Sequence, residues 1–453
     1  MMNAAPTFAQ RWNVWTQRSA NRKIFAAILT VGSLTFIVKL AATVKELFVA
    51  HRFGTSDTLD AFLIALVLPS FLSNVLAASF NPALIPTYVE VYERAGKAEA
   101  QKLFANVMLL CMLFLGAATM LLVIFTSPLL AMIASGFSAE KLALTRALYF
   151  ALLPYLFVSG VSVIWSAILN ARGRFALAAI APIVTPVLTM TLLLTVVKRW
   201  NIYAVVAGTV GGILLETLVL GWSLRRHGFS LLPRWHGMSA ATKQVLQQYA
   251  PVIAGGLVMN CTTLVDQAMA TTLGSGSVAV LNYANKIIAF TLGVATMALG
   301  AAVLPHFSRM AAAGDRAGIR HTLRTYSRLI LAASSAVTIV FIALSEPLVR
   351  LLFQRGAFTA ADTGVVAKTQ IFYLLQVPFY VTSIMIVRLI SSLKANRILL
   401  WGAVISLILK VALNYVFMQR FGVGGIALST SVVYVISFGF LAAALGRLLK
   451  ESS

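Results

Sequence analysis

The chain has 453 residues, of which 60% are hydrophobic and 11% are charged, and its formal net charge is +23. A soluble domain carries roughly 25% charged residues, so this composition excludes a soluble enzyme. The mean hydropathy of +0.89 is typical of a polytopic membrane protein. The positive charge fits cytoplasmic loops that are rich in Lys and Arg, so no nucleic-acid partner is expected.

Twelve α-helical membrane spans are predicted, joined by short connections without an extramembrane domain. They cover residues 24–50, 59–87, 103–126, 144–169, 175–197, 202–224, 246–272, 278–305, 323–345, 364–393, 398–417 and 423–446. Lys and Arg gather in alternate connections, which places both termini in the cytoplasm. The chain divides in order into a cytoplasmic or interfacial N-terminal segment, an N-terminal lobe with the first six spans, a cytoplasmic linker and a C-terminal lobe with the last six, at residues 1–23, 24–228, 229–245 and 246–448.

The second half of the chain repeats the first. Pro305 stands 219 positions after Pro86, and Ser127-Pro128 returns as Glu346-Pro347. Each predicted half contains six spans, an even number, so both copies enter the membrane in the same direction and are related by an axis along the membrane normal. Parallel repeats of this kind are typical of transporters, in which the substrate site lies between the copies.

Six cations fall inside the apolar spans, namely Lys39, Lys45, Lys286, Lys368, Arg388 and Lys410. Each costs roughly 2.5–3.5 kcal/mol at a helix centre on insertion scales. For Lys368, Arg388 and Lys410 the favoured interpretation is snorkelling, in which the long stem carries the charge to the interface. For Lys39, Lys45 and Lys286 a functional role is favoured, because spans 1, 2, 7 and 8 of a two-fold bundle would face one central cavity. Lysines around a cavity predict a phosphate or pyrophosphate ligand.

Four carboxylates lie in or near the spans. Glu46 is expected to pair with a lysine of its own span, and Asp60 lies at a helix start, where capping or a favourable dipole interaction is the simplest role. Asp266 has no cationic neighbour in the sequence, so it either pairs with a distant cation or binds a proton or cation that drives transport. Glu216 is the second candidate for that coupling role.

No set of residues suggests catalysis. The five His residues are scattered along the chain, without a cluster of His, Cys and carboxylates at metal-ligand spacing. A Gly-x-x-x-x-Gly-Lys-Ser/Thr nucleotide loop is absent as well. The sequence therefore predicts a transporter that is not an enzyme, holds no cofactor, and runs on Na⁺, H⁺, the membrane potential or the gradient of its own substrate.

Four blocks of the chain carry a family resemblance. They are Phe53-Gly54-Thr55-Ser56-Asp57-Thr58-Leu59-Asp60-Ala61-Phe62, Ile168-Leu169-Asn170-Ala171-Arg172-Gly173-Arg174-Phe175, Leu281-Asn282-Tyr283-Ala284-Asn285-Lys286 and Phe353-Gln354-Arg355-Gly356-Ala357-Phe358-Thr359. These blocks resemble the MurJ/MviN family of murein-precursor (lipid II) flippases, and the resemblance extends over nearly the whole chain. It implies the fold of the MOP superfamily, which also contains the MATE transporters: two six-helix lobes, a V-shaped cavity and alternating access.

The resemblance also implies a substrate and a site. By position, Lys39, Lys45 and Lys286 match cavity cations that engage the pyrophosphate of a lipid-linked precursor, and Glu46 and Asp60 match acidic positions of the family. The implied activity is movement of lipid II, or of a related undecaprenyl-pyrophosphate-linked glycan, from the inner to the outer leaflet of a bacterial plasma membrane by a monomer. Such a flippase would serve peptidoglycan biosynthesis and cell shape, or polysaccharide export.

Two departures from the family and two alternatives stay open. Ser73-Asn74 stands where the family commonly has a basic pair, and twelve spans are expected where its well-known members carry fourteen. A multidrug-type antiporter of the same superfamily is one alternative, although it would need carboxylates in its cavity to bind cationic drugs. A scaffold that organises cell-envelope enzymes without transport is the other, and it would tolerate loss of the three cavity lysines.

Overall fold

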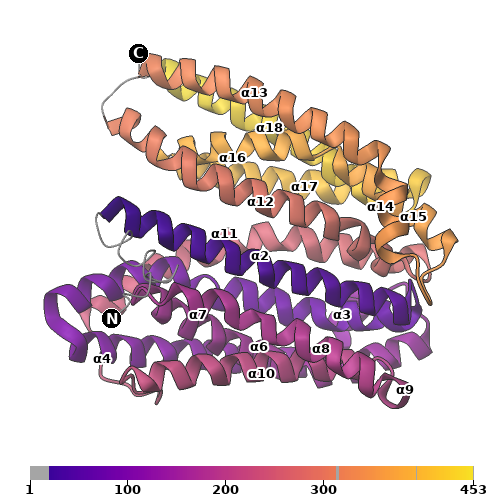
Figure 1. Ribbon diagram of the computed structural model, residues 1–453, viewed down its shortest axis with the longest axis horizontal. Helices are drawn as coiled ribbons and strands as arrows, with labels where there is room; N and C mark the ends of the chain where they lie inside the picture. Colours follow the sequence, from indigo (N-terminus) through magenta and orange to yellow (C-terminus); the bar gives the residue numbers. More distant parts are fainter. Residues whose placement is uncertain (1–19, 313–315, 394, 452–453) are drawn as a thin grey trace, which may run out of the picture. The chain divides into compact units, whose positions relative to one another are not determined.

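The computed structural model describes residues 20–312, 316–393 and 395–451, and these are almost entirely helical (Figure 1). The helices of the first half are α2 (Ala20–Phe53), α3 (Asp57–Leu72), the π-helical turn η1 (Ser73–Ala77), α4 (Phe80–Ile124), α5 (Thr126–Ile133), α6 (Ala139–Ala171), α7 (Phe175–Ile180), the 3-10 turn η2 (Ala181–Ile183), α8 (Val184–Thr195), α9 (Val197–Trp200) and α10 (Tyr203–Arg226). Those of the second half are α11 (Ala240–Ala270), the 3-10 turn η3 (Thr271–Leu273), α12 (Ser277–Ala312), α13 (Arg316–Ala343), α14 (Ser345–Phe353), α15 (Ala360–Leu374), α16 (Val377–Ser392), α17 (Asn396–Phe421) and α18 (Val423–Glu451). The predicted N-terminal segment falls largely outside the described residues.

Each predicted span falls on helical structure, although spans 2, 5 and 10 each cover parts of more than one helix. In the described part of the chain, nine helices are long and apolar enough to cross a membrane. The first of them, Asp57–Ile124, has 68 residues and corresponds to predicted spans 2 and 3. The two spans are separate because Gly96 adopts a non-helical φ of 82° and divides α4. Predicted spans 1 and 8 coincide with α2 and α12, which have 34 and 36 residues. The prediction of an all-α membrane protein is therefore confirmed.

The order of the helices repeats as the sequence does. The short helix α5 follows the third predicted span of the first half, and the short helix α14 follows the third span of the second half. The two helices have 8 and 9 residues and contain Pro128 and Pro347, the matching prolines of the repeat. A short break at this point is thus a shared feature of both copies.

The helices pack into two compact units. Unit 1 comprises the described residues up to Glu46, Leu76–Gly116 and Pro154–Tyr249. Unit 2 comprises Leu47–Val75, Ala117–Leu153 and the described residues from Ala250 onward. These units group helices by packing, whereas the predicted lobes 24–228 and 246–448 rest on the sequence repeat and stay a prediction.

Close helix contact in unit 1 depends on glycine. On α10, Gly208 and Gly212 face Thr189 and Thr185 of α8, and a Cβ atom at either glycine would overlap the threonine opposite. Small residues of this kind allow membrane helices to approach closely, which increases their van der Waals contact.

The predicted cytoplasmic linker is tied to α4 within the same unit. The side-chain oxygen of Asn106 accepts a hydrogen bond from the backbone N–H of His236 at 2.7 Å. Its amide nitrogen donates to the carbonyl of Gly237 at 2.8 Å, and Gln101 donates to the carbonyl of Ser230 at 2.8 Å. Side chains of α4 thus satisfy backbone polar groups of the linker that are not bonded within a helix.

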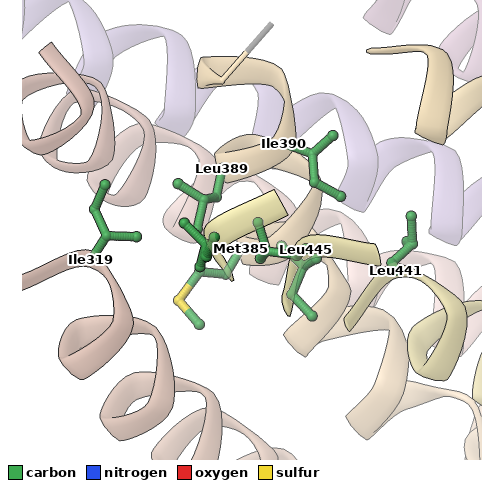
Figure 2. Packing of buried hydrophobic residues seen from close by; sticks show 8 residues of the cluster. Ile319, Met385, Leu389, Ile390, Leu441 and Leu445 are labelled. Atoms are coloured by element: carbon green, nitrogen blue, oxygen red, sulfur yellow. The ribbon is translucent and has the colours of Figure 1, made fainter. Parts of the chain in front are cut away.

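Unit 2 contains a buried apolar cluster between α13, α16 and α18 (Figure 2). Its side chains are at most 6% exposed and belong to Ile319, Met385, Ile386, Leu389, Ile390, Leu441, Leu445 and Leu449. On α16 the buried positions recur at three- and four-residue spacing, which places them on one face of the helix. This packing holds the second half of the chain together around α16.

Candidate functional site

Four segments that are distant in sequence meet within unit 2, at residues 51–60, 133–141, 271–279 and 354–362. We call this region the junction. The predicted topology places all four segments on the same side of the membrane. Their contact in the structure agrees with that placement.

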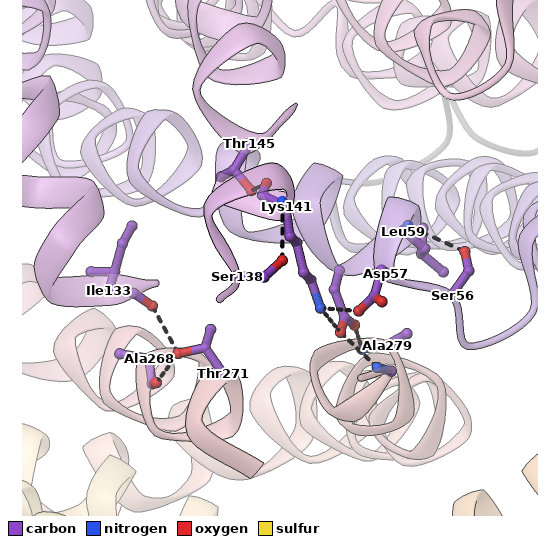
Figure 3. Close-up of polar contacts among 12 residues, drawn as sticks. Ser56, Asp57, Leu59, Ile133, Ser138, Lys141, Thr145, Ala268, Thr271 and Ala279 are labelled. Carbon is purple, nitrogen blue, oxygen red and sulfur yellow. Dashed lines mark hydrogen bonds and ion pairs between the residues drawn. The ribbon is translucent and has the colours of Figure 1, made fainter. Parts of the chain in front are cut away.

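Asp60 contacts two other segments of the junction, and the neighbouring residues Asp57, Lys141 and Ala279 are labelled in Figure 3. Its side chain is fully buried in the first turn of α3, and Oδ2 lies 2.8 Å from Nζ of Lys141. The two carboxylate oxygens also accept hydrogen bonds from the backbone N–H groups of Gly276 and Ala279, each at 2.8 Å. Gly276 directly precedes α12 and Ala279 lies in its first turn, where backbone N–H groups have no intrahelical partner. Asp60 therefore caps α12 and lies at the positive end of its dipole.

The predicted capping role of Asp60 is thus confirmed on a different helix from the expected one. Its own helix, α3, is capped by Ser56, whose side-chain oxygen accepts from the N–H of Leu59 at 3.4 Å. Capping of α12 became possible because Gly276 adopts a φ of 77°, and a Cβ atom there would overlap the carbonyl oxygen of Thr55. A glycine is the residue that tolerates both the positive φ and the close approach.

Lys141 supplies the positive charge of the junction. It lies in the first turn of α6, its side chain is 9% exposed, and its ammonium bridges Asp60 and Asp57 of α3. The ammonium also lies 4.0 Å from the ring centroid of Phe137, within the range of a cation–π contact. Sequence reasoning missed this lysine because it lies outside the apolar spans. The predicted topology could have indicated it, because Lys141 and Asp60 both lie near the starts of helices on the same side of the membrane.

The ends of α2 and α12 are joined by further bonds of the junction. The hydroxyl of Tyr283 on α12 donates to the carbonyl of Gly54, directly after α2, at 3.2 Å. The N–H of Ala357 donates to the carbonyl of His51 on α2 at 2.8 Å. The hydroxyl of Thr55 donates to the carboxylate of Asp362. The end of α2 and the segment that follows it are therefore held by α12, by α15 and by the connection before α15.

The predicted cavity lysines lie on these same two helices. Lys45 on α2 lies 2.8 Å from Oε1 of Glu46, so the predicted pairing of Glu46 within its own span is confirmed. Lys39 is exposed on α2. Lys286 is half-buried on α12. That the three lysines line one cavity and bind a substrate stays a prediction.

The two candidates for cation coupling have different surroundings. In unit 1, Glu216 is 8% exposed and accepts a hydrogen bond from Ser162 at 2.9 Å. In unit 2, Asp266 lies 3.0 Å from the ammonium of Lys410. Of the two interpretations left open for Asp266, pairing with a distant cation is the one that the structure bears out.

The prediction that Lys410 snorkels is wrong. Its side chain is 2% exposed and its ammonium is held in the protein interior by Asp266, because the carboxylate offers a nearer partner than the membrane interface. Lys368 is exposed and Arg388 is half-buried. The described residues contain no group of three or more His, Cys, Asp or Glu side chains that could hold a metal ion.

The chain matches the family model described as Lipid II flippase MurJ over residues 49–451. It belongs to this family. Family membership makes it a transporter, and the described helices that are long and apolar enough to cross a bilayer agree with a multi-pass membrane protein.

Curated relatives match along most of their length. The probable lipid II flippase MurJ of Buchnera aphidicola subsp. Acyrthosiphon pisum is 23% identical over 427 residues, with 91% of this chain and 81% of the relative covered. The protein of the same description from Rickettsia prowazekii is 25% identical over 423 residues, with 92% and 83% covered.

Solved structures share the fold. The lipid II flippase MurJ in its inward closed conformation superposes with a TM-score of 0.79 at 23% identity, covering 92% of this chain and 87% of the other. A multidrug resistance MATE transporter of the MOP superfamily in its inward-facing conformation superposes with a TM-score of 0.73 at 14% identity, covering 94% and 99%. The predicted MOP-type fold is therefore confirmed.

Proposed function

We propose that this chain is a flippase that moves an undecaprenyl-pyrophosphate-linked glycan, lipid II or a related lipid-linked oligosaccharide, from the inner to the outer leaflet of a bacterial plasma membrane. The observation that carries the proposal is the family match over residues 49–451. The curated relatives, described as probable lipid II flippases, support the same substrate class. In this proposal the chain acts as a monomer with both termini in the cytoplasm, and it neither catalyses a reaction nor holds a cofactor.

The proposed headgroup site contains Lys39, Lys45 and Lys286. A lysine ammonium is a compact charge on a flexible stem, so several lysines can follow a pyrophosphate as it moves, without the fixed geometry that an arginine fork imposes. The glycan would enter the cavity with the pyrophosphate, while the polyprenyl chain stays in the lipid.

The junction is the proposed outer gate. Lys286 lies ten residues after Gly276 on α12, which is about 15 Å along the axis at 1.5 Å per residue. A bond network that fixes the first turn of α12 therefore also fixes the helix that carries Lys286. We infer that the outward-open state requires Asp60 to release the N–H groups of α12, so that the helix can move as a rigid element.

The membrane potential favours this direction of transport. Each negative charge that moves outward across an inside-negative potential gains about 2.3 kcal/mol per 100 mV. A pyrophosphate carried outward therefore needs no co-transported ion to make its movement favourable.

Flipping in reconstituted vesicles tests the proposal. The full chain is inserted into vesicles that contain an undecaprenyl-pyrophosphate-linked glycan, and the appearance of the headgroup on the far side is followed. Lys39→Ala and Lys286→Ala are expected to slow flipping about tenfold or more, which corresponds to at least about 1.4 kcal/mol of lost interaction. Lys368→Ala, an exposed lysine within a span, is the matched control and should flip normally. Wild-type rates in both cavity variants would contradict the site assignment.

A further inference from the structure

A lysine is buried in the interior of unit 2, on a helix that contributes no residue to the junction. Lys410 on α17 is 2% exposed. A lysine at the centre of a membrane helix costs roughly 2.5–3.5 kcal/mol on insertion scales, which a nearby anion has to offset. Its Nζ atom lies 3.0 Å from Oδ1 of Asp266 on α11 and donates a hydrogen bond to the hydroxyl of Thr430 on α18. Oxygen atoms from two other helices therefore contact the ammonium.

Further polar side chains hold the carboxylate in place. Asn414, one turn after Lys410 on α17, donates from its amide nitrogen to Oδ1 of Asp266 at 2.8 Å. The amide oxygen of Asn414 accepts a hydrogen bond from the hydroxyl of Ser429 on α18. Both Asn414 and Ser429 are 0% exposed. Together with the lysine, these groups form one hydrogen-bonded network across three helices.

The chemistry of this network is that of a site for a hard cation. Carboxylate, carboxamide and hydroxyl groups supply the oxygen ligands that hard metal ions take in proteins. A single carboxylate among neutral oxygens matches a cation with one positive charge. An ammonium carries the same charge as Na⁺ or K⁺, but the side chain of Lys410 ties it to the backbone, so it cannot be exchanged.

We propose that Lys410 is a tethered cation that permanently fills a monovalent-cation site built by Asp266, Asn414, Ser429 and Thr430. Because the charge is covalently attached, Asp266 takes up no exchangeable Na⁺ or K⁺; we call this the binding consequence, and it does not depend on the proposed function. The transport consequence is that the chain moves its lipid without a coupled alkali ion, and this one rests on the proposed flippase function.

Salt-dependent thermal unfolding tests the binding consequence. The purified full chain is unfolded in NaCl, in KCl and in choline chloride at equal ionic strength, and the midpoint temperature Tm is compared. The wild type should give the same Tm in all three salts. Lys410→Ala leaves the carboxylate and the neutral oxygens free to accept an ion, so its Tm should rise by several degrees, in a saturable way, with NaCl or KCl but not with choline chloride. A Lys410→Ala, Asp266→Asn double variant should lose this rise.

A second substitution guards against misfolding. Lys410→Asn adds an amide oxygen to the site and should show the same alkali-dependent rise in Tm. The matched control Lys368→Ala removes an exposed lysine of the same unit and should show none. If either Lys410 variant folds but its Tm responds to neither alkali ion, the Lys410–Asp266 pair is structural only and the proposal is overturned. Failure of both Lys410 variants to fold in every salt would also overturn it, because the site then accepts no ion in place of the ammonium.

Two results with the wild type also bear on the proposal. A saturable Na⁺ or K⁺ dependence of the wild-type Tm that disappears in Asp266→Asn would overturn it. In vesicles, the wild-type flipping rate should be equal in Na⁺, K⁺ and choline media, and a rate that requires one alkali ion contradicts the transport consequence. Absence of flipping in every medium would instead refute the proposed function and leave the thermal test of the cation site intact.

Discussion

At the scale of single residues, the junction depends on one lysine. Lys141 is almost buried and contacts Asp60, which is fully buried, and Asp57, which is 56% exposed. Forming a buried ion pair is not necessarily stabilising compared with apolar residues, but removing one partner leaves an uncompensated charge in the interior. Without Lys141, Asp60 would keep its two backbone N–H donors but lose the ammonium that neutralises its charge.

Lys141→Ala should therefore lower the thermal stability of the purified protein. Loss of one partner of a buried pair costs about 3–5 kcal/mol, a range that applies to Asp60 and Lys141. Lys102→Ala is the matched control, because Lys102 and Glu99 form a pair with side chains 51% and 49% exposed, for which a contribution of about 1 kcal/mol or less is expected. Unfolding midpoints of the two variants, measured without substrate, give the comparison.

The same measurement separates two roles of Asp60. If Asp60 holds the junction, Asp60→Asn lowers the midpoint without any substrate present. An unchanged midpoint together with lost flipping would contradict the structural role and favour the predicted contact with substrate.

At the scale of helices, α12 begins directly after a backbone turn at Gly276 that glycine fits best. Gly276 has a φ of 77° and lies against the carbonyl of Thr55, so that a Cβ atom would collide with it. Its N–H group also donates to Asp60. The conformation, the close approach and the cap are thus three demands on one residue.

Gly276→Ala is expected to destabilise the junction and to weaken the cap of α12. The strained backbone of a non-glycine residue at positive φ costs on the order of 1–3 kcal/mol, before any displacement of Thr55. Gly364→Ala on α15 is the control, since nothing lies within 4 Å of its added Cβ and alanine is the better helix former by about 1 kcal/mol. The midpoint should fall for the first variant and stay or rise for the second. Equal midpoints would mean that the turn does not limit the junction.

At the scale of the whole molecule, the chain passes between the two units mostly at points where a helix is easily bent. The passages include the π-helical turn Ser73–Ala77, Gly116, Pro154 and a point two residues before Pro251. Proline and π-helical turns interrupt the regular hydrogen bonds of a helix and are common causes of kinks. Bending at such points would let the helices of a transporter move between two states.

Sequence and structure agree most closely on the helices and least on the polar partners. The spans followed from apolar length alone, and the pairing of Glu46 with Lys45 involves neighbouring residues, so both were predictable. Asp266 and Lys410 lie on different helices far apart in the chain, and no periodicity indicates which distant charge a buried carboxylate will meet. Asp60 showed the same limit: its position at a helix start predicted a cap, but only the packing of α12 beside it decided which helix it caps.

The lipid that co-purifies with the full chain gives the most direct test of the proposed flippase function. Mass spectrometry of the wild type should detect a polyprenyl-pyrophosphate-linked glycan, because the proposed lysines bind the pyrophosphate. The triple variant Lys39→Ala, Lys45→Ala, Lys286→Ala should retain about tenfold less of it, while Lys368→Ala should retain as much as the wild type. Equal amounts in the triple variant would contradict the proposed headgroup site, and ordinary phospholipids alone in the wild type would contradict the proposed substrate.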